Sequence, residues 1–225
     1  MAAANHGSSM KPFLIFDLDG TLVDSLRGIA DTLNRTLDAH GLPGHSDASV
    51  RSFIGNGLRN LIARAVPQGT DPALIDSLLA LYRKDYDLTW KQGTTPYPGI
   101  PRMLDELWRE GFTMAVCSNK LHDFTVTMVH GMFPNIHFAQ ILGQRDGMPH
   151  KPDPAGALQL AAAMGGTPEN CVVIGDSTMD IETAANAGMR SIAVSWGYHD
   201  GDRLRAAGPG HLINTPAELR PLLGP

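Results

Sequence analysis

The sequence predicts an α/β protein in which a parallel sheet is covered by helices on both faces and is interrupted by one all-helical insertion. Short apolar runs of strand length alternate with segments of helical spacing along most of the chain. Such alternation is typical of a parallel sheet with crossover helices. One long stretch near the N-terminus breaks the alternation, because its apolar residues follow helical spacing only.

The strands are expected at five apolar runs, and helices are expected between the later ones. The expected strands are residues 13–16, 113–117, 138–142, 172–174 and 191–194. The expected helices are residues 100–110, 121–130, 154–164 and 179–187. A glycine near the end of each helix is expected to stop it, since glycine readily adopts the left-handed conformation found there. These glycines are Gly111, Gly131, Gly165 and Gly188.

The helical insertion leads to a two-domain prediction. Residues 25–92 contain no convincing strand, and the run 94–99 holds two prolines that resist helix continuation and favour a hinge strand. We therefore expect a core domain of residues 11–23 and 95–225 and a helical domain of residues 24–94. Residues 1–10 have the composition of an expression tag or disordered leader.

Composition excludes several classes of partner. The formal net charge is −5 and Lys and Arg do not cluster, which argues against nucleic-acid binding. No apolar stretch approaches the roughly 20 residues of a membrane span. Cys117 and Cys171 each lie in an apolar run, which is typical of reduced core thiols in a cytoplasmic protein. We expect a cytoplasmic monomer or homodimer that binds neither nucleic acid nor membrane.

Polar residues follow four of the predicted strands. Ligands of parallel α/β sheets bind beyond the carboxyl ends of the strands, so these side chains should converge there. The residues concerned are Asp17, Asp19, Ser118, Asn119, Lys151, Asp176 and Asp180.

Asp17 and Asp19 are suited to two different chemical tasks. They stand two residues apart on an extended segment, which directs both carboxylates to one face, and Gly20 allows a sharp turn directly after them. One carboxylate can attack phosphorus while the other exchanges a proton with the leaving oxygen and with water. Taken alone, the pair fits a solvated acidic turn equally well.

The four acidic residues together predict a magnesium site. Such a cluster beside a phosphate dianion requires a cation, and a set of oxygen ligands without His or Cys favours Mg²⁺ over zinc. We expect Asp17 and Asp176 as direct ligands and Asp19 through its backbone carbonyl. Asp180 is expected either to bind the ion directly or to support its ligands. Lys151 and the ion would together offset charge on the phosphoryl oxygens.

Ser118 and Asn119 are candidates for binding a phosphate. Ser118 ends its predicted strand and can offer both a hydroxyl and a backbone N–H, while Asn119 is expected to begin the next helix, where N–H groups are unpaired. A simple helix cap is the alternative role for Ser118.

The chemistry-bearing runs resemble the four motifs of the haloacid dehalogenase superfamily. These motifs are Asp17-x-Asp19-Gly20-Thr21, Ser118, Lys151 and Gly175-Asp176-x3-Asp180. The helical insertion after the first motif resembles the cap of the type-one subfamily. Within the superfamily the chain is most similar to phosphoglycolate phosphatases, through several further runs. These are 16–25, 55–57, 97–99, 118–120, 151–154 and 194–198.

The resemblance implies a Rossmann-like core, a mobile cap, magnesium and in-line attack by Asp17 on a small phosphate ester. Asp19 would act as acid and base, with Thr21 in the phosphate site helping to orient it. Ser118 and Lys151 would hold the transferred group. Ser118 stands where the family more often has Thr, and the hydroxyl is retained.

Substrate choice is expected to depend on the cap, because the core contacts what all phosphate esters share. Gly55, Asn56 and Arg59 are the candidates, and Arg59 would pair with a substrate carboxylate. An Arg early in a helix also commonly faces solvent. The resemblance favours 2-phosphoglycolate as substrate, with a sugar phosphate, a nucleotide, pyrophosphate or a β-phosphoglucomutase-like isomerisation as alternatives.

Two further classes are less compatible with the sequence. A signalling receiver domain is also α/β, binds magnesium and is phosphorylated on Asp, but it needs neither the insertion nor Asp19. A catalytically inactive binding protein has no support, since every expected functional side chain is present.

Overall fold

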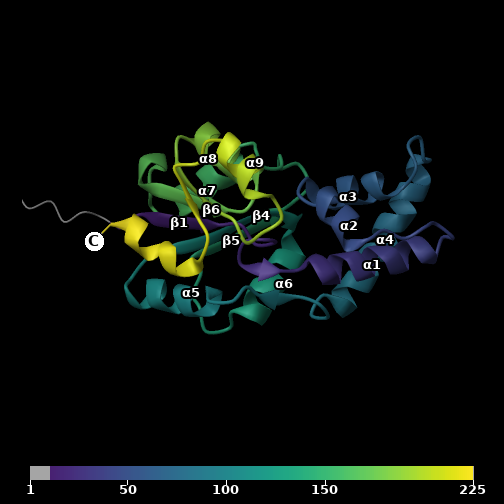
Figure 1. Cartoon of the computed structure of the whole chain (residues 1–225), viewed down its shortest axis with the longest axis horizontal. Coiled ribbons are helices and arrows are strands. Elements are labelled where there is room, and N and C mark those ends of the chain that lie inside the picture. Colours follow the sequence, from purple (N-terminus) through teal and green to yellow (C-terminus); the bar gives the residue numbers. More distant parts are fainter. Residues whose placement is uncertain (1–10, 225) are drawn as a thin grey trace, which may run out of the picture.

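The computed structural model describes residues 11–224 and contains one six-stranded parallel sheet. The strand order is β5-β4-β1-β6-β7-β8, and every pairing in this sheet is parallel (Figure 1). The expectation for residues 1–10 lies outside the described residues. The strands are β1 (Phe13–Phe16), β4 (Met114–Leu121), β5 (Gln140–Gln144), β6 (Cys171–Gly175), β7 (Arg190–Val194) and β8 (His211–Ile213). The predicted α/β fold is confirmed.

β1 lies at the centre of the sheet because its residues are apolar on both sides. It pairs with β4 on one edge and β6 on the other, and Leu14, Ile15 and Phe16 are fully buried. Successive strand residues point to opposite faces, so Leu14 and Phe16 join one hydrophobic cluster and Ile15 joins another. The sheet therefore has a separate core on each face.

Five helices flank this sheet, and they are α5 (Ile100–Arg109), α6 (His122–Met132), α7 (Ala155–Ala163), α8 (Thr178–Ala187) and α9 (Gly201–Ala206). Buried residues of α5 and α6 belong to the cluster of Leu14, whereas those of α7 belong to the cluster of Ile15. In Figure 1, α7 and α8 accordingly lie above the sheet and α5 and α6 below it. Three short 3₁₀ segments complete this part of the chain, namely Pro168–Asn170, Pro216–Glu218 and Arg220–Leu223.

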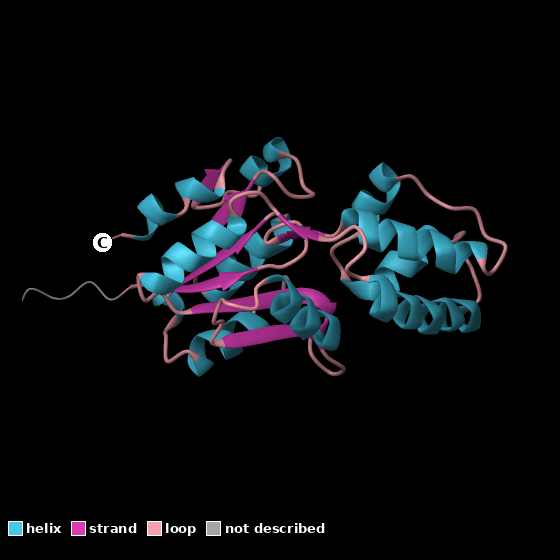
Figure 2. Cartoon of the chain, turned by 90° about the horizontal axis from the view of Figure 1, so that it is seen from below, coloured by secondary structure: helices cyan, strands magenta, loops and turns pink. Residues whose placement is uncertain are grey.

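A separate group of helices lies beside the sheet, as Figure 2 shows. They are α1 (Leu26–Asp38), α2 (Asp47–Phe53), α3 (Gly57–Ala65) and α4 (Pro72–Thr89). The chain enters this group through β2 (Val23–Asp24) and leaves it through β3 (Thr95–Pro96), and these two short strands pair antiparallel. Because both connections run side by side, the helical group is attached at one place. We refer to α1–α4 as the cap.

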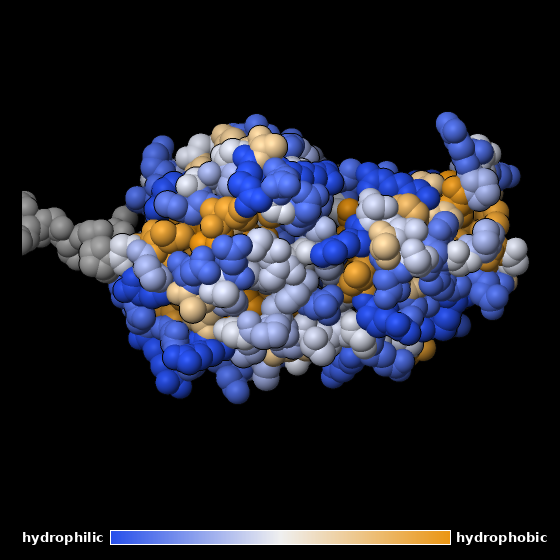
Figure 3. All heavy atoms as spheres, in the orientation of Figure 1, coloured by the Kyte–Doolittle hydropathy of each residue, from blue (hydrophilic) through white to orange (hydrophobic). Residues whose placement is uncertain are grey.

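Apolar side chains hold the cap together and leave its outer surface largely polar. The cap core is formed by one buried stripe on each helix, as helical spacing predicts. Its residues are Ile29, Leu33, Leu37, Val50, Leu61, Ile62, Leu78, Leu79, Tyr82 and Tyr86. On the face drawn in Figure 3, hydrophilic residues cover most of the surface, with smaller apolar areas on both parts. No helix among residues 11–224 is long and apolar enough to cross a membrane.

The structure corrects the expected start of α6. β4 continues past Cys117 to Leu121, with a shift in its pairing with β5, and α6 begins only at His122. Asn119 is therefore a strand residue, and the expectation that it begins a helix was wrong. β8 was not predicted, because a three-residue edge strand with only Ile213 buried has no recognisable apolar run.

Gly131 was wrongly predicted to stop a helix, since it lies inside α6. A Cβ atom at this position would lie 2.7 Å from Cη2 of Trp90, the residue that follows α4. Gly131 is thus explained by the close approach of a cap side chain to a core helix. The other three predicted stops do follow helix ends.

We expect Gly131→Ala to lower the free energy of unfolding by about 1–3 kcal/mol, because the added methyl group collides with buried Trp90. Without this collision, replacing glycine by alanine inside a helix would raise the free energy of unfolding by about 0.5–1 kcal/mol. Urea unfolding of the two proteins measures the difference. In a Trp90→Leu background the cost should disappear, whereas a Gly131→Ala protein more stable than the parent would contradict the packing argument.

Candidate active site

A pocket opens between the carboxyl edge of the sheet and the cap. Its sheet side carries polar residues that follow the strands, as ligand sites of parallel sheets do. These are Asp17, Asp19, Ser118, Asn119, Lys120, Lys151, Asp176 and Ser177. The cap side is mostly apolar. It is lined by Ile29, Ile54, Gly55, Gly57, Leu58, Leu61, Tyr82 and Tyr86.

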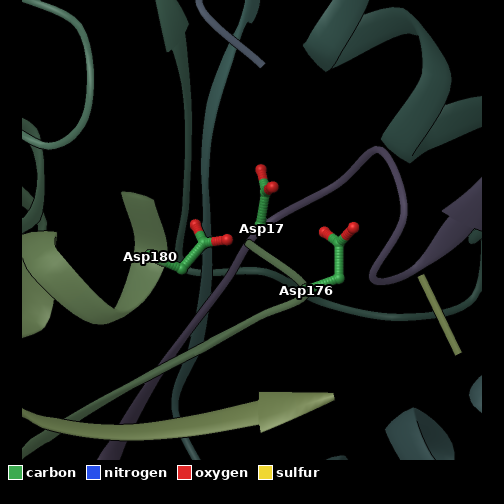
Figure 4. Close-up of side chains that lie close together, drawn as sticks. All are labelled: Asp17, Asp176 and Asp180. Atoms are coloured by element: carbon green, nitrogen blue, oxygen red, sulfur yellow. The ribbon is translucent and has the colours of Figure 1, made fainter. Parts of the chain in front are cut away.

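Three carboxylates lie close together at this edge of the sheet (Figure 4), and two of them, Asp17 and Asp176, line the pocket. Asp17 follows β1, Asp176 follows β6 and Asp180 lies in the first turn of α8, and each offers an oxygen within 4.8 Å of the others. Apart from the Lys151 ammonium at 2.9 Å, the buried Oδ1 of Asp17 has no polar partner among residues 11–224. A close set of oxygen ligands with a free lone pair suits a hard divalent cation.

Burial raises the pKa of two of these carboxyl groups. The pKa of Asp17 rises to about 7, mainly through burial, with the charge of Asp180 adding to the effect and Lys151 opposing it. The pKa of Asp176 rises to about 8, again mainly through burial, with Asp17 and Asp180 adding repulsion. A bound cation would relieve both the repulsion and the loss of hydration.

Lys151 places a positive charge next to the carboxylate cluster. Its ammonium lies 2.9 Å from Asp17 Oδ1 and 2.6 Å from Asp180 Oδ1, and it donates a hydrogen bond to the carbonyl of Cys117 at 3.0 Å. Burial opposes the charged form of Lys151, but Asp17 and Asp180 outweigh burial and raise its pKa. Lys151 therefore remains an ammonium in the pocket.

Asp180 is fixed by the start of its own helix. Its Oδ2 accepts hydrogen bonds from the backbone N–H and the hydroxyl of Ser177, at 3.1 and 2.6 Å. Ser177 in turn caps α8 in a reciprocal arrangement. Since Oδ1 of Asp180 contacts Lys151, both of its oxygens are engaged by the protein.

Thr21 contacts Asp176 rather than Asp19, so the expectation that it orients Asp19 was wrong. Its hydroxyl donates to Asp176 Oδ1 at 3.0 Å, and the backbone N–H of Tyr198 donates to Oδ2 at 2.6 Å. The turn at Gly20 brings Thr21 towards β6, and a Cβ at Gly20 would lie 2.3 Å from Asp176. The close approach of the β1 loop to Asp176 thus requires glycine.

Residues not assigned a role from the sequence orient Asp19. The hydroxyl of Ser25 donates to Asp19 Oδ1 at 2.5 Å, and the ammonium of Lys120 lies 3.2 Å from both carboxylate oxygens. The Tyr198 hydroxyl lies 3.0 Å from that of Ser25. Ser25, Lys120 and Tyr198 belong to the runs 16–25, 118–120 and 194–198, so their motifs were visible although their contacts were not.

Asn119 joins the sheet side of the pocket to the cap. Its amide donates to the carbonyl of Lys151 at 3.1 Å and to that of Gly55 at 2.8 Å, and its Oδ1 accepts from the N–H of Lys151. Gly55 lies in the turn between α2 and α3 and lines the pocket. Ser118 also lines the pocket, and its hydroxyl accepts from the N–H of Lys120.

Two cap candidates do not line the pocket. Arg59 forms an ion pair with Asp76 at 2.6 Å on the outer surface of the cap, where both side chains are more than half exposed. Asn56 precedes α3 but is not a lining residue, and its carbonyl accepts from Asn60. The pocket side of α3 is formed instead by Leu58 and Leu61, so the expected contact of Arg59 with a substrate was wrong.

A parallel α/β sheet with clustered carboxylates and a lysine at its carboxyl edge is suited to phosphoryl-group chemistry assisted by a divalent cation. The chain belongs to the haloacid dehalogenase-like hydrolase family, whose model matches residues 14–194. Within that family it is a phosphatase acting on phosphoric monoesters.

Named relatives agree with this assignment. The chain is 34% identical over 193 residues to "Phosphoglycolate phosphatase" of Mesorhizobium japonicum, covering 84% of this chain and 85% of the relative. It is 31% identical to the protein of the same name from Pectobacterium atrosepticum, with 94% and 92% covered. The crystal structure of a predicted phosphoglycolate phosphatase from Haemophilus somnus superimposes with a TM-score of 0.90 at 26% identity, covering 97% of this chain and all of that one.

Without metal, stability should fall as the pH rises. Asp17 and Asp176 keep protons in the folded state that the unfolded chain has released, because folding raises each pKa from 3.8 to about 7 and about 8. Above about pH 4, each carboxyl should lower the free energy of unfolding by about 1 kcal/mol per pH unit, and the contribution of Asp17 should level off as the pH approaches 7. Urea unfolding in EDTA at about pH 5.5 and about pH 7 measures this slope.

Asp176→Asn serves as the matched control for this slope. Removing one of the two titrating carboxyl groups should make the decrease with pH about half as steep. A parent protein whose stability rises over the same interval would contradict the assignment of raised pKa values to these groups.

Proposed function

We propose that this protein is a Mg²⁺-dependent phosphatase that hydrolyses 2-phosphoglycolate through a covalent aspartyl-phosphate on Asp17. The observation that carries the proposal is the cluster of Asp17, Asp176 and Asp180 at the carboxyl edge of the sheet, with Lys151 paired to Asp17 and Asp180. The relatives named as phosphoglycolate phosphatases support the substrate.

The metal ligands we assign are the carboxylates of Asp17 and Asp176 and the backbone carbonyl of Asp19. Both oxygens of Asp180 already accept hydrogen bonds, from Ser177 and from Lys151. We therefore assign Asp180 a supporting role, in which it positions Lys151 beside the ligands. When bound, Mg²⁺ supplies positive charge that offsets the charge on the phosphoryl oxygens. Thr21 and the N–H of Tyr198 hold Asp176 in place for this role.

Asp17 and Asp19 divide the chemistry between them. A carboxylate oxygen of Asp17 attacks phosphorus in line with the ester bond, and that bond breaks as Asp19 donates a proton to the departing alcohol oxygen. Asp19 then takes a proton from water as the water oxygen attacks the phosphorus of the aspartyl-phosphate. Inorganic phosphate leaves and Asp17 is regenerated as a carboxylate.

The transferred group is held by Ser118 on β4 and by Lys151 in the turn before α7. Ser118 offers a hydroxyl and Lys151 an ammonium to the phosphoryl oxygens, and both residues line the pocket. Asn119 fixes the backbone of Lys151 through two hydrogen bonds and reaches Gly55 of the cap. We infer that cap closure and placement of Lys151 are linked through this amide.

The proposal extends to the cellular location and the partners of the protein. Cys117 and Cys171 are buried and not disulfide-bonded, which supports a cytoplasmic location. The partner we propose is a small phosphate ester, with no nucleic acid or membrane, and the chain acts as a monomer or homodimer.

A substrate panel tests the proposed activity. With Mg²⁺ present, phosphate release from 2-phosphoglycolate should exceed release from β-glucose 1-phosphate and from pyrophosphate at equal concentration. EDTA should stop release and excess Mg²⁺ should restore it, because the carboxylate cluster needs a cation beside a phosphate. Preference for another ester would overturn the substrate, and interconversion of sugar phosphates without phosphate release would overturn the hydrolase.

Substitution of the two motif carboxylates tests the mechanism. Asp17→Asn should abolish turnover, because an amide cannot form the aspartyl-phosphate. Asp19→Asn should slow turnover about 100- to 10,000-fold through loss of proton transfer. Steady-state phosphate release measures both, and circular dichroism checks that each variant folds. Undiminished hydrolysis by Asp17→Asn would rule out the covalent route.

A further inference from the structure

The cap provides no cation for an anionic leaving group. Its pocket-lining residues are apolar, aromatic or glycine. Arg59 is held by Asp76 on the outside, and Arg51 donates to the carbonyl of Gly197 and lies over the Tyr198 ring. A substrate carboxylate placed against this wall would lose its hydration without a partner, which is costly.

Among the basic side chains that line the pocket within residues 11–224, Lys120 has the most remaining capacity to bind an anion. Lys151 already contacts Asp17, Asp180 and a backbone carbonyl. His199 accepts a hydrogen bond from the N–H of Thr178. Its pKa is lowered, mainly by burial, which favours the neutral ring.

Lys120 holds its ammonium between the catalytic carboxylate and the cap. The nitrogen lies 3.2 Å from each Asp19 oxygen and 4.6 Å from the centre of the Tyr86 ring, and the side chain is only 9% exposed. An ammonium has three N–H donors, and the structure gives this one a single carboxylate partner at rather long distance. Donor capacity therefore remains for a second anion.

The position of Lys120 matches a carboxylate close to the ester oxygen. Asp19 must lie beside the oxygen of the departing alcohol to protonate it. Groups on the adjacent carbon of that alcohol then fall next to whatever flanks Asp19. In 2-phosphoglycolate the carboxylate is separated from the ester oxygen by a single methylene group, so it lies within the range of an ammonium bound to Asp19.

We propose that Lys120 selects the substrate, by pairing with a carboxylate on the leaving group while remaining in contact with Asp19. The proposal rests on the proposed phosphatase function and deepens it, since it assigns to a core residue the role that the sequence suggested for Arg59. Because the Lys120 side chain is only 9% exposed, little water competes for its ammonium, which strengthens this pairing.

Binding of two phosphonates tests the proposal without requiring turnover. 3-Phosphonopropionate replaces the ester oxygen of 2-phosphoglycolate by methylene, and propylphosphonate differs from it by a methyl group in place of the carboxylate. By isothermal titration calorimetry with Mg²⁺, the parent protein should bind 3-phosphonopropionate at least about tenfold more tightly than propylphosphonate. In Lys120→Met this ratio should fall to within about twofold.

The ratio separates selection from a general effect on the site. Loss of the Asp19 partner in Lys120→Met affects both ligands and cancels in the ratio, and measurable binding of propylphosphonate shows that the pocket has folded. Lys120→Arg should retain a preference for the carboxylate, and so should Arg59→Met, the matched control on the cap surface.

Each outcome bears on a different assignment. A Lys120→Met protein that keeps the tenfold ratio, or a parent protein with no preference, overturns the role of Lys120. A parent protein that prefers 3-phosphonopropionate, loses the preference in Lys120→Met and yet releases no phosphate from 2-phosphoglycolate contradicts the proposed substrate and supports the carboxylate site of Lys120.

Discussion

The charge balance among Asp17, Asp176 and Asp180 constrains the whole site. Three largely buried carboxylates within 4.8 Å of one another, beneath a pocket whose cap side is mostly apolar, repel one another and have lost most of their hydration. Lys151 offsets part of this charge through two short ion pairs. The remainder appears as raised pKa values for Asp17 and Asp176. The excess of negative charge that lowers stability without metal would also attract a cation. Loss of stability and cation affinity therefore have one origin.

Close backbone packing maintains this arrangement. Asp176 is enclosed by Gly20 and Gly197, where a Cβ would approach it to 2.3 and 2.2 Å. Trp196 donates its indole N–H to the carbonyl of Thr21, which ties the loop after β7 to the loop after β1. The hydrogen bonds to the Asp176 carboxylate depend on these close approaches. The two glycines are therefore needed to position Asp176 as well as to form the fold.

The parallel sheet and the carboxylate cluster could be predicted because they depend on local patterns. Apolar runs such as β1 end directly at polar residues, and parallel strands bring their carboxyl ends to one edge. What could not be predicted depends on contacts between distant segments. Thr21 bonding to Asp176 and Gly131 accommodating Trp90 require knowledge of which loops and helices meet. The bulge that extends β4 past Asn119 likewise leaves no periodic signal.

The outward position of Arg59 moves the proposed specificity site from the cap to the sheet edge. A charged residue on the cap would read the substrate only after closure, whereas Lys120 lies on the same strand as Ser118 and touches Asp19. Recognition of the leaving group would then share the rigid sheet edge with the chemistry, and the cap would contribute mainly an apolar cover that removes water. The hydrogen bonds of Asn119 to Gly55 and to Lys151 link that cover to the lysine that we propose binds the phosphoryl oxygens. Exclusion of water would strengthen both ammonium contacts at once, so closure of one cap serves phosphate binding and leaving-group selection together.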